Sequence, residues 1–291
     1  MDMVNEKLNL SIVILTYNEE TNLPRCLDSV KSLNCDIFVV DSGSKDKTLE
    51  IAQKYNTHVY IHNFENHTKQ WIWALDNLPI KTEWILALDA DQILTYELSQ
   101  EIKEIFSKNS DFLEDINGFW IKRRQIFRGK WIKNGGYYPI YLLKLFRKDK
   151  VYLSELDMAN HYFYVKGRTA KLKHDIIEEN LKELDIIFWI KKHINYANLM
   201  AEEEFKAKNS LENNIVNSIY KNSPSYKKKA IERKIWYRLP LYLRSVAYFM
   251  YRYFFRLGFL DGKEGFIFHF LQAFWFRILV DIRLEDLLKE N

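Results

Sequence analysis

Cysteine, proline and glycine are all scarce in this chain of 291 residues, which has two Cys, five Pro and nine Gly. Two cysteines, Cys26 and Cys35, cannot build a disulfide framework and suit a reducing compartment. So few prolines and glycines argue against a fibrous or low-complexity chain. Because 47% of the residues are apolar and 15% are aromatic, the chain can bury a sizeable core.

Signals for secretion and for membrane insertion are also missing. Residues 1–8 are polar and carry acids, and the apolar run that follows them is too short for a secretory signal. No uncharged run reaches the roughly 18–20 residues that a membrane-spanning helix needs. We therefore expect a cytoplasmic protein.

Positive charge is unevenly distributed, although the net charge is only +4. Residues 227–256 contain nine Lys or Arg and one acid, Glu232, among many aromatic residues. This asymmetry predicts a catalytic or binding body followed by a basic tail that seeks a surface. Because the arginines of residues 241–260 share one side of a predicted helix, we expect residues 227–280 to contact a membrane surface peripherally, on the inner face of the cell membrane. The alternative is a helical subdomain packed on the body.

The first hundred residues alternate between apolar runs and helical patterns. We expect strands at 10–17, 36–41, 57–62 and 84–89, with helices at 23–30, 48–55 and 67–77. After residue 110 we expect strands at 117–127, 141–147 and 161–167, a long helix at 181–207 and a polar linker at 208–226. This pattern predicts an α/β fold with a Rossmann-like, mostly parallel sheet flanked by helices and a C-terminal helical extension. The predicted domains are 1–220, with halves of about 1–110 and 111–207, and 221–291.

Polar residues follow three of the first four predicted strands. In an open parallel sheet, ligands bind beyond the carboxyl ends of the strands, so these residues should share one edge. An aromatic ring, a carboxylate, a Gly-containing turn and an acidic pair could together hold a nucleoside diphosphate and a hard cation. The residues are Thr16, Tyr17, Asn18, Glu19, Asp41, Ser42, Asp89 and Asp91.

Three segments that contain these residues, "SIVILTYNEE", "VVDSGSKDKT" and "ALDAD", resemble the family 2 glycosyltransferases. That family has the GT-A fold and uses nucleotide sugars. Three later segments, "GKWIKNGGYYPIYLLKLFR", "KLKH" and "GFLDGKEGF", resemble a bacterial subgroup that includes lipopolysaccharide-core β-glucosyltransferases. The resemblance covers roughly residues 9–280.

The resemblance implies a role for each matching position. Asp41 would accept a hydrogen bond from the base of the nucleotide, with UDP as the default. Asp91 would ligate Mg²⁺ or Mn²⁺ on the diphosphate. The implied nucleotide-sugar pocket comprises Thr16, Tyr17, Asn18, Glu19, Asp41, Ser42, Lys69, Gln70, Asp89 and Ala90.

The implied reaction inverts the anomeric carbon in a single displacement by an acceptor hydroxyl. A carboxylate or imidazole would remove the acceptor proton, and the candidates are Glu155, His161 and Asp157. The subgroup usually has a His-Glu pair where this chain has Asn160-His161, so the identity of the base stays open. The Gln-x-x-Arg-Trp motif of processive synthases is absent, which favours transfer of one sugar.

The implied acceptor is a cell-envelope glycan or a lipid-linked molecule, as in lipopolysaccharide or polysaccharide biosynthesis. Candidate acceptor-side residues are Arg123, Trp131, Tyr137 and Tyr138. One alternative is a polyprenyl-phosphate sugar transferase, and another is a non-catalytic glycan-binding relative. A nucleic-acid-binding protein is a third, but it would leave the three aspartates at the strand ends unexplained, so we expect no nucleic acid partner.

Overall fold

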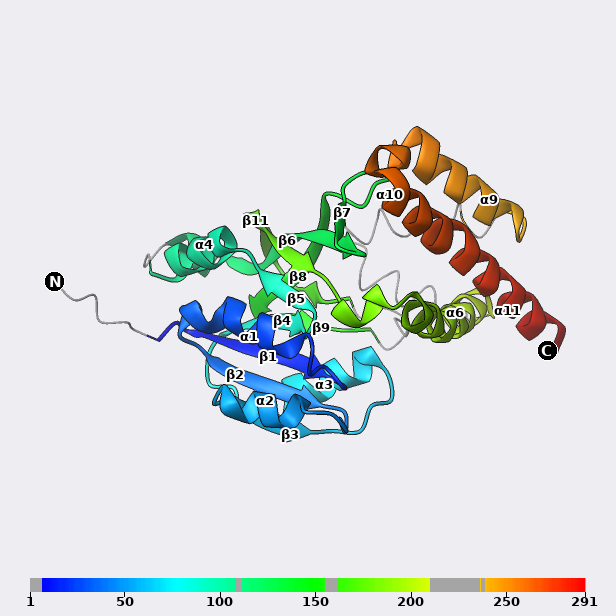
Figure 1. The fold of residues 1–291 in the computed structure, drawn as a ribbon. Coiled ribbons are helices and arrows are strands. Elements are labelled where there is room, and N and C mark those ends of the chain that lie inside the picture. The colour runs from blue at the N-terminus through cyan, green and yellow to red at the C-terminus, as the bar shows by residue number, and fades with distance from the viewer. Residues whose placement is uncertain (1–6, 108–110, 155–161, 210–235, 237–238, 291) are drawn as a thin grey trace. The chain divides into compact units, whose positions relative to one another are not determined.

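The structure is a computed structural model that describes residues 7–107, 111–154, 162–209, 236 and 239–290 (Figure 1). The chain divides into two compact units, Met1–Asp185 and Ile186–Asn291, and each is described by itself. The long helix α6 (Ile186–Asn209) therefore belongs to the second unit. The predicted domain boundary at 220/221 lies outside the described residues and stays a prediction.

Four parallel strands form the first half of the main sheet in the order β3-β2-β1-β4 (Figure 1). Helices connect them, and Pro24 lies in the first turn of α1, where its missing N–H costs nothing. The alternation predicted for this half is confirmed. The elements are β1 (Leu10–Thr16), α1 (Leu23–Val30), β2 (Asp36–Asp41), α2 (Thr48–Lys54), β3 (His58–Ile61), α3 (His67–Asn77) and β4 (Trp84–Asp89).

The second half makes the sheet mixed rather than mostly parallel. β8 (Ile140–Arg147) runs antiparallel to β4 and to β6 (Ile116–Phe127), and β11 (Arg168–Glu178) runs parallel to β6. β5 (Gln92–Leu94) closes the order beside β11, and β7 (Lys130–Ile132) pairs with β6. The α/β class is confirmed. Two further helices in this half are α4 (Tyr96–Ser107) and α5 (Asp111–Glu114).

The strand predicted at 161–167 is wrong in extent. Of its described residues, only Tyr164–Val165 form a strand, β10, which pairs with β9 (Val151–Tyr152) outside the main sheet. The sheet strand is instead the next segment, β11, whose pairing with β6 is interrupted by register shifts. These shifts break the two-residue alternation by which a strand is recognised.

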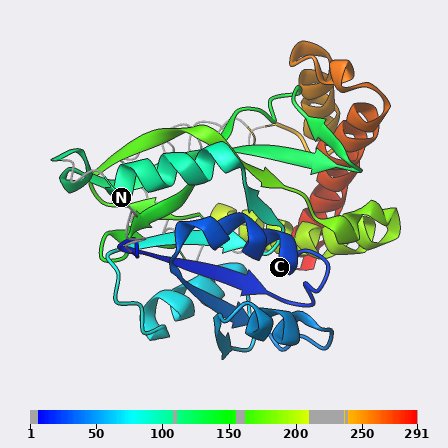
Figure 2. The same cartoon turned by 60° about the vertical axis from the view of Figure 1, so that its left-hand side comes forward.

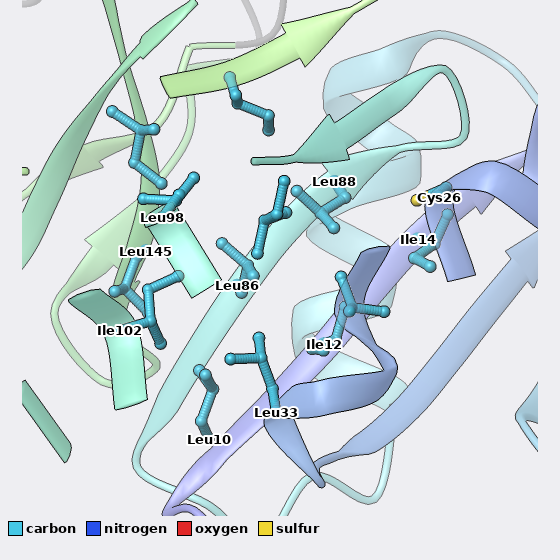
Figure 3. Packing of buried hydrophobic residues seen from close by; sticks show 14 of the residues in the cluster. Leu10, Ile12, Ile14, Cys26, Leu33, Leu86, Leu88, Leu98, Ile102 and Leu145 are labelled. Atoms are coloured by element: carbon cyan, nitrogen blue, oxygen red, sulfur yellow. The ribbon is translucent and has the colours of Figure 1, made fainter. Parts of the chain in front are cut away.

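Side chains of the central strands fill two cores because successive residues point to opposite faces. Leu10, Ile12 and Ile14 of β1 pack with residues of α1 and α4, whereas Val13 packs toward α3. Figure 3 shows the first core, and Figure 2 shows α1 and α4 on one face of the sheet. Burial on both faces explains the continuous apolar runs of these strands.

The second unit is helical, and the predicted C-terminal helical extension is confirmed. The predicted helix at 181–207 is divided: Leu181–Leu184 form a 3₁₀ turn in the first unit, and α6 follows. Side chains of α6 and α11 form the core of the second unit. The remaining helices are α9 (Leu243–Met250), a π-helical stretch (Tyr251–Phe255), a 3₁₀ turn (Gly258–Asp261), α10 (Gly262–His269), a second π-helical stretch (Phe270–Trp275) and α11 (Phe276–Glu290).

Candidate functional site

The acidic strand ends meet at one edge of the parallel sheet. Thr16 of β1 is the register partner of Asp41 in β2, and Leu15 of β1 is the partner of Asp89 in β4. Asp41 and Asp89 therefore lie two strand spacings apart, about 10 Å between their backbones. This edge, the ends of β1, β2 and β4 with the loops that follow, is called the acidic edge below.

Asp41 is fully buried and organises the turn that follows β2. Its Oδ1 accepts hydrogen bonds from the backbone N–H groups of Gly43 at 2.9 Å and Ser44 at 2.7 Å. Its Oδ2 accepts from the hydroxyls of Thr16 at 2.9 Å and Ser44 at 2.5 Å. Because a carboxylate has about four acceptor positions, these four donors use its capacity. The predicted contact between Asp41 and a base stays a prediction.

The loop after β1 is fastened to the same turn. Asn18 has a left-handed backbone with φ of 53°, which Asn tolerates better than most residues. Its backbone N–H donates to Ser44 Oγ at 2.7 Å, and its Oδ1 accepts from the backbone N–H of Lys45 at 2.8 Å. The side chain of Tyr17 is held out from this loop with 54% of the residue exposed. Its ring is therefore open to stack on a ligand.

Glu19 is held by one distant residue, Lys182, and by one neighbour in the sequence, Asn22. Its Oε1 lies 2.6 Å from Nζ of Lys182, and its Oε2 accepts from Nδ2 of Asn22 at 2.7 Å. Lys182 also donates to the backbone oxygen of Asn18 at 3.0 Å. The Glu19 side chain is only 15% exposed. Glu19 thus fixes the loop, and no local pattern around Lys182 predicts this contact.

Ser42 connects the acidic edge to α3. Gln70 is buried and donates from Nε2 to Ser42 Oγ at 3.2 Å and to the backbone oxygen of His62 at 3.1 Å. Its Oε1 lies 2.7 Å from His62 Nδ1. Lys69 lies on the exposed side of α3, 2.5 Å from Glu65. The structure therefore brings Gln70 into the hydrogen-bonded network around Ser42.

Asp89 is paired with a buried cation that the sequence analysis missed. Oδ2 of Asp89 lies 2.8 Å from Nζ of Lys144, whose side chain is 4% exposed. The backbone N–H of Asp89 donates to Oε1 of Gln92 at 3.1 Å. Ala90 is buried, and Asp91 is partly exposed at the turn between β4 and β5. The available signal was one lysine inside the apolar run of residues 142–146.

Cys26 lies beneath these carboxylates. Its Sγ is 3.8 Å from the backbone oxygen of Asp89. Burial, followed by the negative charges of Asp91 and Asp89, raises the pKa of the Cys26 thiol, while Lys144 lowers it. The thiol therefore stays protonated and behaves as a small apolar group.

The carboxylates at the acidic edge fit a divalent cation that also binds the substrate. Among the described residues, no group of three or more His, Cys, Asp or Glu side chains could hold a metal ion. Asp89 and Asp91 alone supply two hard carboxylates. Mg²⁺ usually keeps several waters and takes one or two carboxylates together with substrate phosphates, which matches this pair.

Of the acceptor-side candidates, Arg123, Trp131 and Tyr138 are half-buried and Tyr137 is buried. The rings of Trp131 and Tyr138 meet edge to face at 5.0 Å. Arg123 pairs through Nη1 with Oε1 of Glu178 at 3.1 Å and is 18% exposed at its side chain. Tyr137 is only 8% exposed, so its ring does not form a platform at the surface. The candidate bases Glu155, Asp157 and His161 lie outside the described residues.

The "KLKH" segment, residues 171–174, has a structural role. It lies where the register of β11 against β6 shifts between Lys171 and Asp175. Oε1 of Glu101 in α4 accepts from the backbone N–H of Lys173 at 2.9 Å, and its Oε2 accepts from that of His174 at 3.1 Å. The carboxylate of Glu101 thus satisfies backbone groups that the interrupted strand pairing leaves over.

Comparison with known proteins identifies the family through a family model that matches half of the chain. A family model described as "Glycosyl transferase family 2" matches residues 11–163. An uncharacterised glycosyltransferase of Rickettsia conorii is 37% identical over 101 residues, which is 35% of each chain. The chain thus matches about a third of the length of this relative.

Two solved structures are similar at low sequence identity. TarS of S. aureus in complex with UDP-GlcNAc has a TM-score of 0.43 and 14% identity, and the match covers 97% of this chain and 92% of TarS. Glucosyl-3-phosphoglycerate synthase of Mycobacterium tuberculosis with Mn²⁺ and UDP has a TM-score of 0.32 and 18% identity, with coverage of 41% and 44%.

Proposed function

Because this chain belongs to glycosyl transferase family 2, we propose that it moves one sugar from a nucleotide-sugar donor, by default a UDP-sugar, to a cell-envelope or lipid-linked acceptor. The observation that carries the proposal is the convergence of Thr16, Asp41 and Asp89 at the acidic edge. Three adjacent strands deliver polar groups there, although their other residues are apolar.

Each part of the acidic edge has a task in this proposal. The exposed ring of Tyr17 stacks on the base, and the buried carboxylate of Asp41 holds the turn against which the nucleoside lies. Asp91 would hold Mg²⁺ or Mn²⁺, with Asp89 near the ribose or the water shell of the cation, and the bound cation would offset the charge that grows on the departing diphosphate. The acceptor hydroxyl attacks the anomeric carbon from the opposite side and inverts it. Glu155, His161 or Asp157 takes its proton.

Metal-dependent donor binding tests this proposal. We expect UDP with Mn²⁺ to raise the melting temperature of the protein, because a ligand that binds only the folded state stabilises it by about 2.7 kcal/mol at a hundredfold excess over Kd. Asp91→Asn should lose this stabilisation. Asp149→Asn, which removes an exposed carboxylate paired with Lys150, should keep it. An unchanged response in Asp91→Asn rejects the metal role.

The second unit supports a membrane-proximal acceptor. The segment 239–260 has no acid, but the predicted stripe of three arginines is wrong at Arg244, which is buried and paired with Glu204 and Asp281. Arg252 and Arg256 remain, and the segment exposes large apolar side chains, among them Phe255 at 77% and Leu260 at 60%. Such a surface fits peripheral binding to anionic lipid. The helical stretch Gly258–Glu290 is also long and apolar enough to span a membrane by length and composition, with 39% of its most apolar window buried.

Vesicle flotation separates these possibilities. The full chain should float with anionic vesicles and be released by alkaline carbonate, and the double variant Phe255→Glu/Leu260→Glu should not float. Leu288→Glu, at an equally apolar exposed site (42%) on α11, is the matched control and should float. Resistance to carbonate contradicts peripheral binding and favours a span.

Salt-sensitive RNA binding that survives Asp91→Asn favours the nucleic-acid alternative. Transfer to a polyprenyl phosphate instead of a glycan identifies the sister enzyme class.

A further inference from the structure

Lys144 is a lysine in the interior of an apolar strand. It lies in β8 between Leu143 and Leu145, and only 3% of the residue is exposed. Lysine is almost never buried to this extent unless it is paired. Its partner is Asp89 at the acidic edge, 2.8 Å from its ammonium nitrogen. The pair therefore joins a buried positive charge to the site at which donor and metal are proposed to bind.

The backbone of β8 is distorted at this residue. Phe119 of β6 is the register partner of Leu145, but the next residue, Trp120, is the partner of Leu143. Lys144 is thus the extra residue of a β-bulge. Bulges re-aim a side chain and are enriched next to active sites. Successive side chains of a regular strand point to opposite faces, so the extra residue changes the direction of the Lys144 side chain. The ion pair with Asp89 therefore depends on the bulge.

The ammonium changes the charge that a ligand meets at the acidic edge. Asp89 and Asp91 alone would carry a charge of −2, which attracts a free divalent cation and repels a diphosphate. Lys144 reduces the sum to −1. Removing one charge a few ångströms from a ligand changes both affinities substantially at the effective dielectric constant of a protein surface.

We propose that Lys144 is a positioning residue whose fixed counter-charge makes the acidic edge take up its divalent cation together with the donor diphosphate rather than before it. This inference rests on the proposed function. Lys144 also holds the carboxylate of Asp89 in one orientation, since a 2.8 Å contact to a buried ammonium restricts it. Asp91, two residues further along at the same edge, is the carboxylate to which we assign the cation that arrives with the diphosphate.

Two separate binding measurements test the proposal without any turnover. Mn²⁺ alone is titrated and followed by electron paramagnetic resonance, and UDP alone is titrated in EDTA by calorimetry. In Lys144→Met, we expect Mn²⁺ to bind roughly tenfold more tightly and UDP roughly tenfold more weakly, each about 1.4 kcal/mol. Lys144→Arg keeps the charge and should resemble the wild type. Lys150→Met removes an exposed lysine and should change neither affinity.

The opposite signs of the two changes make the outcome decisive. A loss of both affinities in Lys144→Met indicates a merely structural lysine and overturns the proposal, as does a change of less than twofold in both. If Lys144→Met does not fold, Lys144→Gln keeps a hydrogen-bond donor toward Asp89 without the charge and is measured in the same way. Failure of the wild type to bind UDP even with Mn²⁺ is a different result and rejects the proposed function itself.

Discussion

Replacement of Asp41 should separate a structural role of this carboxylate from a direct contact with the donor. Asp41→Ala removes the acceptor of four hydrogen bonds, two from backbone N–H groups and two from hydroxyls. A hydrogen bond to a charged group contributes about 1.5–3 kcal/mol, and donors left without a partner add to the loss. Since water can reach part of this turn and the four losses are not additive, we expect about 4 kcal/mol of destabilisation.

Asp41→Asn should be much milder because the geometry accommodates an amide. The amide oxygen can keep the two backbone N–H donors of Gly43 and Ser44. The amide NH₂ then faces the hydroxyls of Thr16 and Ser44, which can rotate and accept instead of donating. The hydroxyl of Thr16 can turn toward the backbone oxygen of Val40, which is 3.5 Å away. We expect a loss of about 1–2 kcal/mol, which reflects the missing charge.

Urea titration of both variants measures these free energies of unfolding, with Asp149→Ala as an exposed control that should stay within about 0.5 kcal/mol of the wild type. Equal destabilisation by Ala and Asn, or a loss below about 1 kcal/mol for Ala, refutes the account of the turn. The same proteins then report on the donor. If the Asn variant is folded but loses stabilisation by UDP with Mn²⁺, Asp41 contacts the base. If it keeps that stabilisation, Asp41 acts only through the turn.

Two further predictions concern the second unit. Gly258→Ala should destabilise the protein by about 1–3 kcal/mol, because the new Cβ would come within 2.7 Å of the His269 ring and 2.9 Å of the Arg252 backbone oxygen. The control Gly129→Ala, with φ of 75° and nothing within 4 Å, should lose only about 1–2 kcal/mol through backbone strain. Equal melting temperatures of Gly258→Ala and the wild type would contradict this packing. Burial, and then the charge of Arg252, lowers the pKa of His269 to about 4. Because the unfolded chain binds this proton more readily, the free energy of unfolding should fall as pH drops from about 6.5 to about 4, by about 3 kcal/mol more in the wild type than in His269→Gln. Parallel pH profiles of the two proteins would contradict this prediction.

The donor half of the fold was predictable because its physical signals are local. Strands covered on both faces form apolar runs, as Ile12 to Leu15 and Ile85 to Leu88 do, and each run ends at a polar residue, Thr16 or Asp89. The register that brings Asp41 beside Thr16 follows from parallel pairing of neighbouring strands. The ends of three strands were therefore sufficient to predict the acidic edge from the sequence.

The missed features depend on partners that are distant in sequence. Lys182 meets Glu19 across 163 positions, and Lys144 meets Asp89 across 55. In the sequence, Lys182 looks like an ordinary exposed charge, and Lys144, although it interrupts an apolar run, shows no sign of its partner. The bulge in β11 likewise disguises a long strand, because the shift at Lys171–Asp175 disrupts its alternation. Tertiary pairing, rather than any local preference, decides these features.

The glycine-rich segment "GFLDGKEGF" shows how a motif can be recognised without its cause. Its resemblance to a subgroup of glycosyltransferases says nothing of what its glycines do. In the structure, a Cβ on Gly265 would lie 2.4 Å from Cβ of Asp261, and one on Gly258 would meet the ring of His269. Small residues are therefore required where the turn at Gly258–Asp261 packs against α10. The motif thus shapes the turn that contains the exposed Leu260 and follows the exposed Phe255.

The sequence also could not separate residues that touch a ligand from residues that hold those residues in place. Asp41 and Gln70 are buried, Glu19 is half-buried, and all three are engaged with protein partners. Tyr17, by contrast, is exposed. Much of the acidic edge is thus ordered before any donor arrives, and ordering that is already present need not be supplied by binding energy. It follows that substitutions at the buried positions should lower stability and donor affinity together, while Tyr17→Ala should lower donor affinity and leave the free energy of unfolding within about 0.5 kcal/mol.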